Sequence, residues 1–402
     1  MSFQQGLSGL NAAAKNLDVI GNNVANSGTV GFKQSQAQFA DVYANSLTGS
    51  GGSNVGIGTK VATVAQQFTQ GNITSTNNPL DIAINGGGFF RMDNNGEINY
   101  QRNGQFQLDS MGFIVSSGGA KLTGYTADAS GVLSTGSPAP ISISTTDIVP
   151  NVTSEVNAVL NLDSSVANLT AAGFNMNDPT TFHNSTSVSV YDSLGNAHTL
   201  QTYYVKTAAG TWNVYASTDG GAASAVGTLN FGTDGALTTA MPLSTSVAVT
   251  TGATTPFNVD IDYTGTTQFG SAFSVNTLNQ DGYTSGRLAG FNIGANGIIL
   301  GRYTNGQSAV LGQVVLASFA NPNGLQPMGN NMWAETATSG APLVGSPDTG
   351  SLGVLQSSAV EDSNVDLTAE LVNMITAQRV YQANAQTIKA QDAVLQTLVN
   401  LR

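Results

Sequence analysis

The feature that most constrains this chain is a stretch at its C-terminus, residues 363–402, which has the pattern of one long helix. Its apolar residues recur in alternating steps of three and four, although Gln, Ala or Asp occupies some positions of the repeat. Ser363 or Asp366 can cap the start, and no Pro or Gly interrupts the run. At about 1.5 Å per residue such a helix is roughly 50 Å long, so it needs a partner along its length.

The partner is predicted at the other end of the chain, in residues 1–30. Apolar and small residues there follow the same spacing, and Ser2 with Gln5 has the capping-box pattern of a helix start. Together the two helices predict an assembly interface consisting of Phe3, Leu7, Leu10, Ala14, Leu17, Val24, Leu367, Leu371, Met374, Tyr381, Ile388, Leu395 and Val399.

The polar faces of both helices carry amides, hydroxyls and alanines but few charges. A helix that lies on a membrane surface would carry Lys and Arg there. In a homopolymer every charge is repeated at each subunit and must find a partner, so an uncharged face favours packing against copies of the same chain. The alternative is a two-helix hairpin that packs only on its own domain.

Composition limits the remaining possibilities. The net charge of −12 and pI of about 4.3 argue against nucleic acid and anionic membranes as partners. Only 9% of the residues are charged, 40% are hydrophobic and 47 are Gly, which predicts a folded chain of turn-rich β structure. The chain has no Cys, so disulfides and thiolate chemistry are excluded. It has no cleavable signal pattern and no long apolar run, so we expect it to stay in the cytoplasm or to leave without a cleaved signal peptide.

Three sequence words resemble one known family. The first lies at the end of the N-terminal helix, in GNNVAN (21–26) and TVGFK (29–33), and the second is LDIAINGGGFF (80–90). The third is C-terminal, in NVDL (364–367) and AQRVYQANA (377–385). In this order they are similar to the signatures of bacterial flagellar rod and hook proteins. The signature residues are Asn22, Asn23, Ala25, Asn26, Gly31, Phe32, Gln378, Arg379, Tyr381 and Asn384.

The resemblance implies a structural protein and not an enzyme. Within the family, the length of this chain and its extra β insertion indicate the hook branch, whose subunits form a curved helical tube that transmits torque as a universal joint. The alternatives are a distal rod subunit, or an extracellular β protein that binds carbohydrate. Implied partners are copies of the chain, the distal rod, hook cap and hook–filament junction proteins and the flagellar export apparatus, with no nucleic acid, no membrane insertion and no cofactor. The implied location is the extracellular hook.

The expected fold is mainly β with long terminal helices, in a nested order. The helices form a coiled-coil-like pair, and two β-rich domains, each a barrel or sandwich, are inserted between them. The predicted boundaries are a terminal helical domain at 1–30 and 363–402, a connector at 31–70, a first β domain at 71–145 and 285–362, and an inserted outer β domain at 146–284.

The sequence gives only weak support for catalytic or metal-binding groups. Asp260 and Asp262 alternate with apolar residues on one predicted strand, so both carboxylates share a face, but no His or Arg lies nearby to assist them. His183 and His198 match no metal spacing, and we predict that both are incidental. The segment Gly56–Lys60 lacks the spacing of a phosphate-binding loop. We therefore predict no catalytic, cofactor or metal site.

Overall fold

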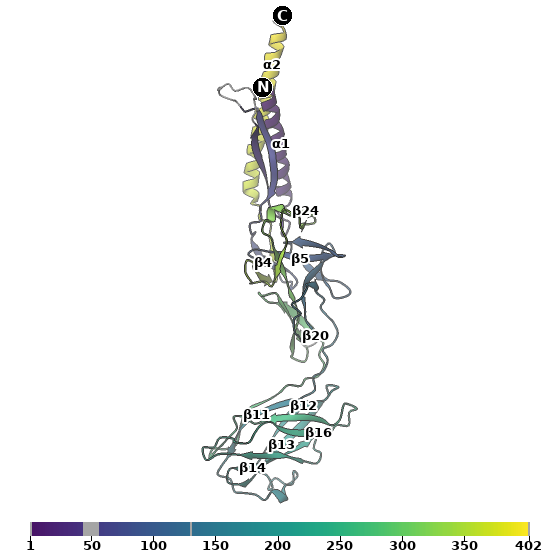
Figure 1. Cartoon of the computed structure of the whole chain (residues 1–402), viewed down its shortest axis with the longest axis vertical. Helices are drawn as coiled ribbons and strands as arrows, with labels where there is room; N and C mark the ends of the chain where they lie inside the picture. The colour runs from purple at the N-terminus through teal and green to yellow at the C-terminus, as the bar shows by residue number, and fades with distance from the viewer. Residues whose placement is uncertain (1, 43–55, 129–130, 401–402) are drawn as a thin grey trace. The chain divides into compact units, whose positions relative to one another are not determined.

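The computed structural model describes residues 2–42, 56–128 and 131–400 (Figure 1). The expectation of a mainly β chain with paired terminal helices is confirmed. The chain forms two compact units, which we call the first and the second unit. The first unit consists of Met1–Ser144, Gly290–Gly301 and Ser308–Arg402, and the second of Thr145–Ala289 and Arg302–Gln307.

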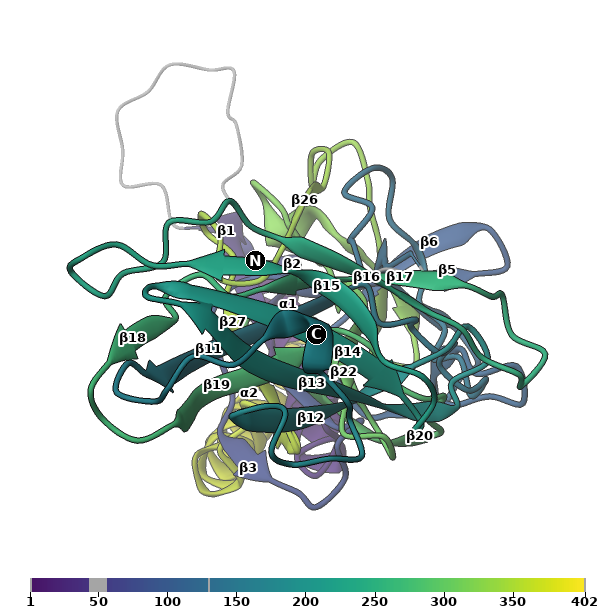
Figure 2. The same ribbon diagram turned by 90° about the horizontal axis from the view of Figure 1, so that it is seen from below.

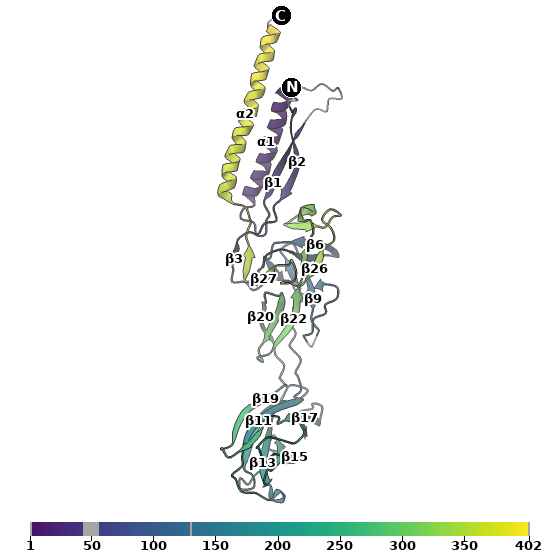
Figure 3. The ribbon, with the colours of Figure 1, turned by 60° about the vertical axis from the view of Figure 1, so that its left-hand side comes forward.

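The terminal helices belong to the first unit and flank each other. The helix α1 spans Ser2–Ala25 and α2 spans Leu367–Asn400. A hairpin of β1 (Ser35–Val42) and β2 (Gly58–Gln66) lies on the other side of α1, which is therefore sandwiched between the hairpin and α2 (Figure 3). No helix in the described part of the chain is both long and apolar enough to cross a bilayer.

The start of α2 is fixed by the residue that the sequence marks as a cap. The Asp366 carboxylate accepts hydrogen bonds from the backbone N–H groups of Thr368 (2.9 Å) and Ala369 (3.1 Å), which have no partner inside the helix. At α1, the side chain of Ser2 lies outside the described residues. Gln5 donates its side-chain N–H to the carbonyl of Gly56, so it ties α1 to the segment that leads into β2.

The β part of the first unit is one large sheet with two small ones. The central order is β20-β21-β22-β9-β5-β6-β25-β24, and β4 and β3 pair with β27 and β28 near α2. The strands are β3 (Ile73–Ser75), β4 (Ile82–Asn85), β5 (Phe89–Asn94), β6 (Glu97–Gln101), β7 (Phe106–Leu108), β8 (Ile114–Ser116), β9 (Lys121–Thr126), β10 (Ala139–Pro140), β20 (Leu288–Ile293), β21 (Ile298–Tyr303), β22 (Ser308–Val314), β23 (Leu316–Ser318), β24 (Gln326–Gly329), β25 (Met332–Ala334), β26 (Leu343–Gly345), β27 (Val354–Ser357) and β28 (Ala359–Glu361).

Local sequence explains how these strands turn and where their core lies. Asn95 and Gly96 form the two-residue loop between β5 and β6 with φ of 55° and 94°, which is the backbone that an Asn-Gly turn favours. Phe89, Phe319 and Trp333 pack edge to face with ring centroids 5.7 to 5.9 Å apart. This aromatic cluster is part of the buried core of the first unit.

The second unit has two sheets that share one core. One sheet has the order β16-β17-β11-β18 with β19 beside β11, and the other has the order β12-β13-β14-β15 (Figure 2). Its strands are β11 (Glu155–Asp163), β12 (Asn184–Tyr191), β13 (Ala197–Ala208), β14 (Thr211–Thr218), β15 (Ser224–Asn230), β16 (Leu243–Val247), β17 (Phe257–Asp262), β18 (Thr267–Phe269) and β19 (Ser274–Gln280). Trp212 and Val214 of β14 face Val259 and Ile261 of β17 in this core, and all four are nearly inaccessible. The alternation predicted for both strands is confirmed, and the result is a sandwich.

Candidate functional site

The antiparallel helix pair is held by small side chains on α1. A Cβ atom on Gly6 would lie 3.1 Å from the side chain of Ile388, and a Cβ atom on Gly9 would lie 2.6 Å from the side-chain oxygen of Asn384. On α2, Ala377 is also buried. Glycine and alanine allow two backbones to approach closely, so small residues set the spacing of this contact and larger side chains such as Ile388 pack against them.

The predicted apolar seam of α2 is only partly covered in a single chain. Met374 and Ile388 are half-buried, whereas Leu367, Leu371 and Leu395 are 45%, 44% and 56% exposed. These side chains are therefore free to contact another copy, and the assembly interface stays a prediction.

The remaining predicted interface residues show the same division. On α1, Phe3 and Leu7 are 47% and 44% exposed, and on α2 Tyr381 is 37% exposed. Half-buried positions are Leu10, Ala14, Leu17 and Val24, and the side chain of Val399 lies outside the described residues. A single chain thus leaves large apolar side chains of both helices in water.

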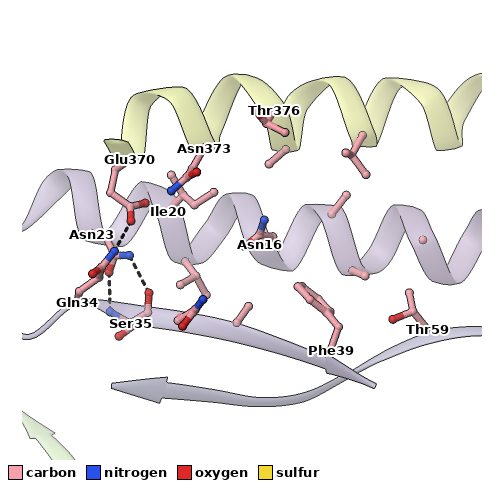
Figure 4. Close-up of a pocket in the computed structure, with 18 of the residues that line it drawn as sticks. Asn16, Ile20, Asn23, Gln34, Ser35, Phe39, Thr59, Glu370, Asn373 and Thr376 are labelled. Atoms are coloured by element: carbon pink, nitrogen blue, oxygen red, sulfur yellow. Dashed lines mark hydrogen bonds between the residues drawn. The ribbon is translucent and has the colours of Figure 1, made fainter. Parts of the chain in front are cut away.

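A groove of about 730 Å³ runs along α1 (Figure 4). Its floor is α1 from Gly9 to Asn23, one wall is α2 from Glu370 to Asn384, and the other wall is β1 with Thr59. At about 1.5 Å per residue the floor is roughly 21 Å long. The lining combines small apolar side chains with amides, and Glu370 is the only charged residue among the described residues that line it.

Amide side chains fix the base of this groove. Asn23, which is 1% exposed, donates to the backbone oxygen of Ser35 (2.8 Å) and accepts from its N–H (2.9 Å). Asn364 accepts from the backbone N–H of Gln34 (2.7 Å), and the Gln34 side chain donates to Oε1 of Glu370. The end of α1, the start of β1 and the start of α2 are therefore joined by hydrogen bonds (Figure 4).

A buried ion cluster lies next to these hydrogen bonds. The Glu361 carboxylate contacts Nζ of Lys33 at 2.7 Å and Nη1 of Arg102 at 3.1 Å, and it accepts the backbone N–H of Gly71 at 2.9 Å. All three charged side chains are at most 4% exposed. Burial lowers the pKa of both basic groups, and the charge of Glu361 opposes that effect. The sequence analysis missed this cluster, although Lys33 ends the word TVGFK.

The signature residues have different structural roles. The Asn26 side chain donates to the carbonyl of Asn22 at the end of α1. Ala25 is exposed and Phe32 is half-buried. Gly31 has φ of 72°, and a Cβ there would lie 2.5 Å from the backbone nitrogen of Asn103, so only glycine fits.

The C-terminal signature word, residues 377–385, contains both exposed residues and residues that contact α1. Gln378 and Arg379 are exposed on α2, whereas Asn384 contacts α1. The word therefore contains two residues that serve the helix pair, Ala377 and Asn384, and two that have no role within a single chain's helix contact.

Both histidines of the second unit have structural partners within the fold. His198 is 7% exposed, and its ring nitrogens lie 2.6 Å from Oδ2 of Asp219 and 3.2 Å from Oδ2 of Asp192. His183 accepts the backbone N–H of Lys206 at Nδ1 and lies 2.8 Å from the carbonyl of Ala167 at Nε2.

The environment of His198 favours its charged form. Burial alone lowers the pKa of this imidazole, but hydrogen bonds to Asp219 and Asp192 and their charges outweigh it, so the pKa is raised. Burial raises the pKa of Asp192, but hydrogen bonds from Thr251, Asn196 and His198 more than reverse that, so the pKa is lowered. A protonated His198 between two carboxylates, which we call the His198 clamp, joins the turn before β13 to the turn after β14.

Asp260 and Asp262 do share one face of β17, as predicted. Asp260 accepts the hydroxyl of Ser244, and Asp262 accepts the backbone N–H of Thr264. Glu155 is the register partner of Asp260 in the parallel pair of β11 and β17. Among the described residues, no group of three or more His, Asp or Glu side chains is arranged to hold a metal ion.

Comparison with known proteins gives matches along nearly the whole chain. Residues 3–33 match the family model described as flagella basal body rod protein, and 356–401 match the C-terminal model of flagellar basal body rod FlgEFG proteins. Residues 83–159 match the D1 domain of flagellar hook protein FlgE/F/G, and 161–283 match the D2 domain of flagellar basal body protein FlaE.

Curated relatives align over the full length. The chain is 44% identical to flagellar hook protein FlgE of Salmonella typhimurium over 411 residues and to that of Escherichia coli over 410, covering 100% of each chain. It is 33% identical to FlgE of Borreliella burgdorferi over 441 residues, covering 100% of this chain and 99% of that one. The crystal structure of Helicobacter pylori flagellar hook protein FlgE2 has the same fold, with a TM-score of 0.56 at 14% identity over 72% of this chain and 100% of that chain.

Proposed function

The chain belongs to the family of flagellar hook proteins, and we propose that it is the structural subunit of a bacterial hook, which assembles into a curved helical tube and transmits torque as a universal joint. The observation that carries this proposal is the set of exposed apolar side chains on both terminal helices, Phe3, Leu7, Leu371 and Leu395 among them. Exposed apolar side chains that lie along long helices favour burial against another copy.

The contacts between subunits are heterologous in this proposal. In such contacts a patch on one copy meets a different patch on the next, and a rotation that does not close produces a helical polymer. The terminal helices form a stiff close-packed core, and the β units shift slightly against their neighbours as the tube turns. The low content of charged residues supports such shifts, because few ion pairs have to be desolvated or broken.

The location and partners follow from the family. We place the protein in the extracellular hook, with no enzymatic activity. Beyond its own copies, its proposed partners are the distal rod protein, the hook cap protein, the hook–filament junction protein and the export apparatus.

Electron microscopy of the purified chain, driven to assemble by concentration and precipitating salt, tests the proposal. We expect uniform curved tubes. Straight rods would instead support a rod subunit. Dispersed particles under all conditions, with both termini intact, would contradict self-assembly through the terminal helices.

A further inference from the structure

The groove between α1, α2 and β1 contains one carboxylate, that of Glu370, with only one of its two oxygens hydrogen-bonded. Glu370 is 3% exposed and its Oε1 accepts the side-chain N–H of Gln34, but its Oε2 has no hydrogen-bond partner among the described residues. An ionised carboxylate accepts hydrogen bonds at both oxygens, and burial without a donor is unfavourable. Since the lining has no cationic side chain, the groove lacks the group that would complete this carboxylate.

The same helix presents a matching group on its opposite face. Arg379 is nine residues from Glu370, which places it about 180° around the helix at 100° per residue. It is exposed and makes no ion pair or hydrogen bond within the described chain. Val372 and Ile375, 59% and 52% exposed, precede it at helical spacing and form one stripe with it.

We propose that the outward stripe of α2, consisting of Val372, Ile375 and Arg379, docks in the groove of a second copy of this chain, where Arg379 pairs with Oε2 of Glu370. This inference rests on the proposed function and identifies one of its contacts. A guanidinium is the suited donor because it binds carboxylates through a planar fork. The small apolar residues of the groove floor, Ala12, Ala13 and Ile20, would receive the two aliphatic side chains.

The geometry of this contact makes it open-ended. The stripe and the groove face opposite ways from the same helix, so a subunit that receives one neighbour in its groove still presents its own stripe to the next. A contact of this kind is heterologous and propagates without limit unless its rotation closes.

Cross-linking tests the contact directly because the natural chain has no Cys. We would assemble the Glu370→Cys/Arg379→Cys double variant and treat the polymer with a short thiol-specific bifunctional cross-linker. A cross-linker is preferred to oxidation because an Arg–carboxylate pair sets the two Cα atoms further apart than a disulfide allows. Within one chain the two positions are separated by about 13.5 Å along the helix and face opposite sides, so a ladder of covalent oligomers reports contact between copies.

Matched controls separate this contact from others. Each single cysteine variant should give at most dimers, and Glu370→Cys with Lys389→Cys should give no ladder. A ladder from the Lys389 pair, or none from the Arg379 pair in well-formed tubes, overturns the inference. Failure of the unmodified chain to form tubes would instead contradict the proposed function.

A double-mutant cycle provides the second measurement. We expect Glu370→Gln and Arg379→Gln each to raise the critical concentration for assembly about tenfold, which is about 1.4 kcal/mol per subunit, and the double variant to raise it no further. Additive effects, or no effect of Arg379→Gln, would mean that the two side chains act independently and would overturn the pairing.

Discussion

Glu361 joins parts of the first unit that are far apart in sequence. Its carboxylate holds Lys33, which follows α1, and Arg102, which follows β6, while its own strand β28 leads to α2. The Arg102 guanidinium also donates to the carbonyl of Gly86. One buried side chain therefore links the helical part of the unit to its β sheet.

Replacing this carboxylate should be costly. We expect Glu361→Gln to destabilise the first unit by about 3–5 kcal/mol, because two buried cations lose their counter-charge. Urea denaturation followed by the fluorescence of Trp333 would measure the loss. Glu97→Gln, at the exposed first position of β6, is the control and should change stability little. A loss below about 1 kcal/mol for Glu361→Gln would show that the cluster is hydrated or replaceable.

The His198 clamp predicts pH-dependent stability of the second unit. Because the folded pKa of His198 is raised above its usual value of about 6.5, the clamp contributes fully below that pH and is lost as pH rises through the folded pKa. Asp192, whose pKa is lowered, loses its contribution only in strong acid.

We therefore expect His198→Gln to destabilise the second unit by about 1–2 kcal/mol near pH 5.5 and by clearly less near pH 9. Denaturation curves recorded across this range, with Trp212 as the probe, measure the difference. His183→Gln serves as the comparison, since His183 contacts backbone groups and no carboxylate. An equal loss at both pH values would show that His198 acts by packing and not by charge.

At the scale of elements, α2 has two kinds of residue along its length: small residues that hold it to α1 and larger apolar residues that stay exposed. Small residues such as Gly6, Gly9 and Ala377 hold α1 and α2 together, and larger apolar residues such as Leu371 and Leu395 stay exposed. Leu395 lies on the turn of α2 beyond Ile388, which is already opposite Gly6 near the start of α1. Its exposure thus follows from the greater length of α2.

Polar substitutions in the exposed seam should block assembly and spare the fold. We expect Leu371→Asp or Leu395→Asp to leave monomers with native β structure and to raise the critical concentration beyond reach, because a buried carboxylate would lie in each contact between copies. Sedimentation and circular dichroism check the two parts of this prediction. Gln386→Asp, on an exposed polar position of α2, is the matched control. Normal tubes from either leucine variant would exclude that residue from the interface.

An element could be predicted from the sequence when the residues that determine it lie close together in the chain. The helices, the cap at Asp366 and the alternating strands β14 and β17 follow from spacing within a few residues, so the sequence was sufficient to predict them. The ion cluster of Lys33, Arg102 and Glu361 joins residues up to 328 positions apart, and no local pattern marks it. The face that α2 turns to α1 does not follow from hydrophobic spacing, because the spacing reports which residues are apolar and not which neighbour covers them.

At the scale of the whole molecule, each unit has its own buried core, and the two tryptophans are divided between them. Trp333 packs in the aromatic cluster of the first unit and Trp212 in the core of the second. Each of the two units of the chain therefore contains one tryptophan that can report on it by fluorescence.

We expect two unfolding transitions that respond independently to substitution. Glu361→Gln should lower only the transition of the first unit and His198→Gln only that of the second, because mutations in separate cores add without coupling. Scanning calorimetry of the full chain, with tryptophan fluorescence to assign each transition, measures this. A single transition that both variants shift equally would show that the units unfold as one.

The second unit enters and leaves the chain at adjacent points. The backbone N–H of Ile148 donates to the carbonyl of Gly286 at 2.8 Å, so the segments that lead into and out of the unit lie side by side. The segment between these two positions could therefore be lengthened, shortened or replaced in the gene, and Ile148 and Gly286 could still pair. Such a join leaves the meeting point of the two flanking segments independent of the length of the segment between them.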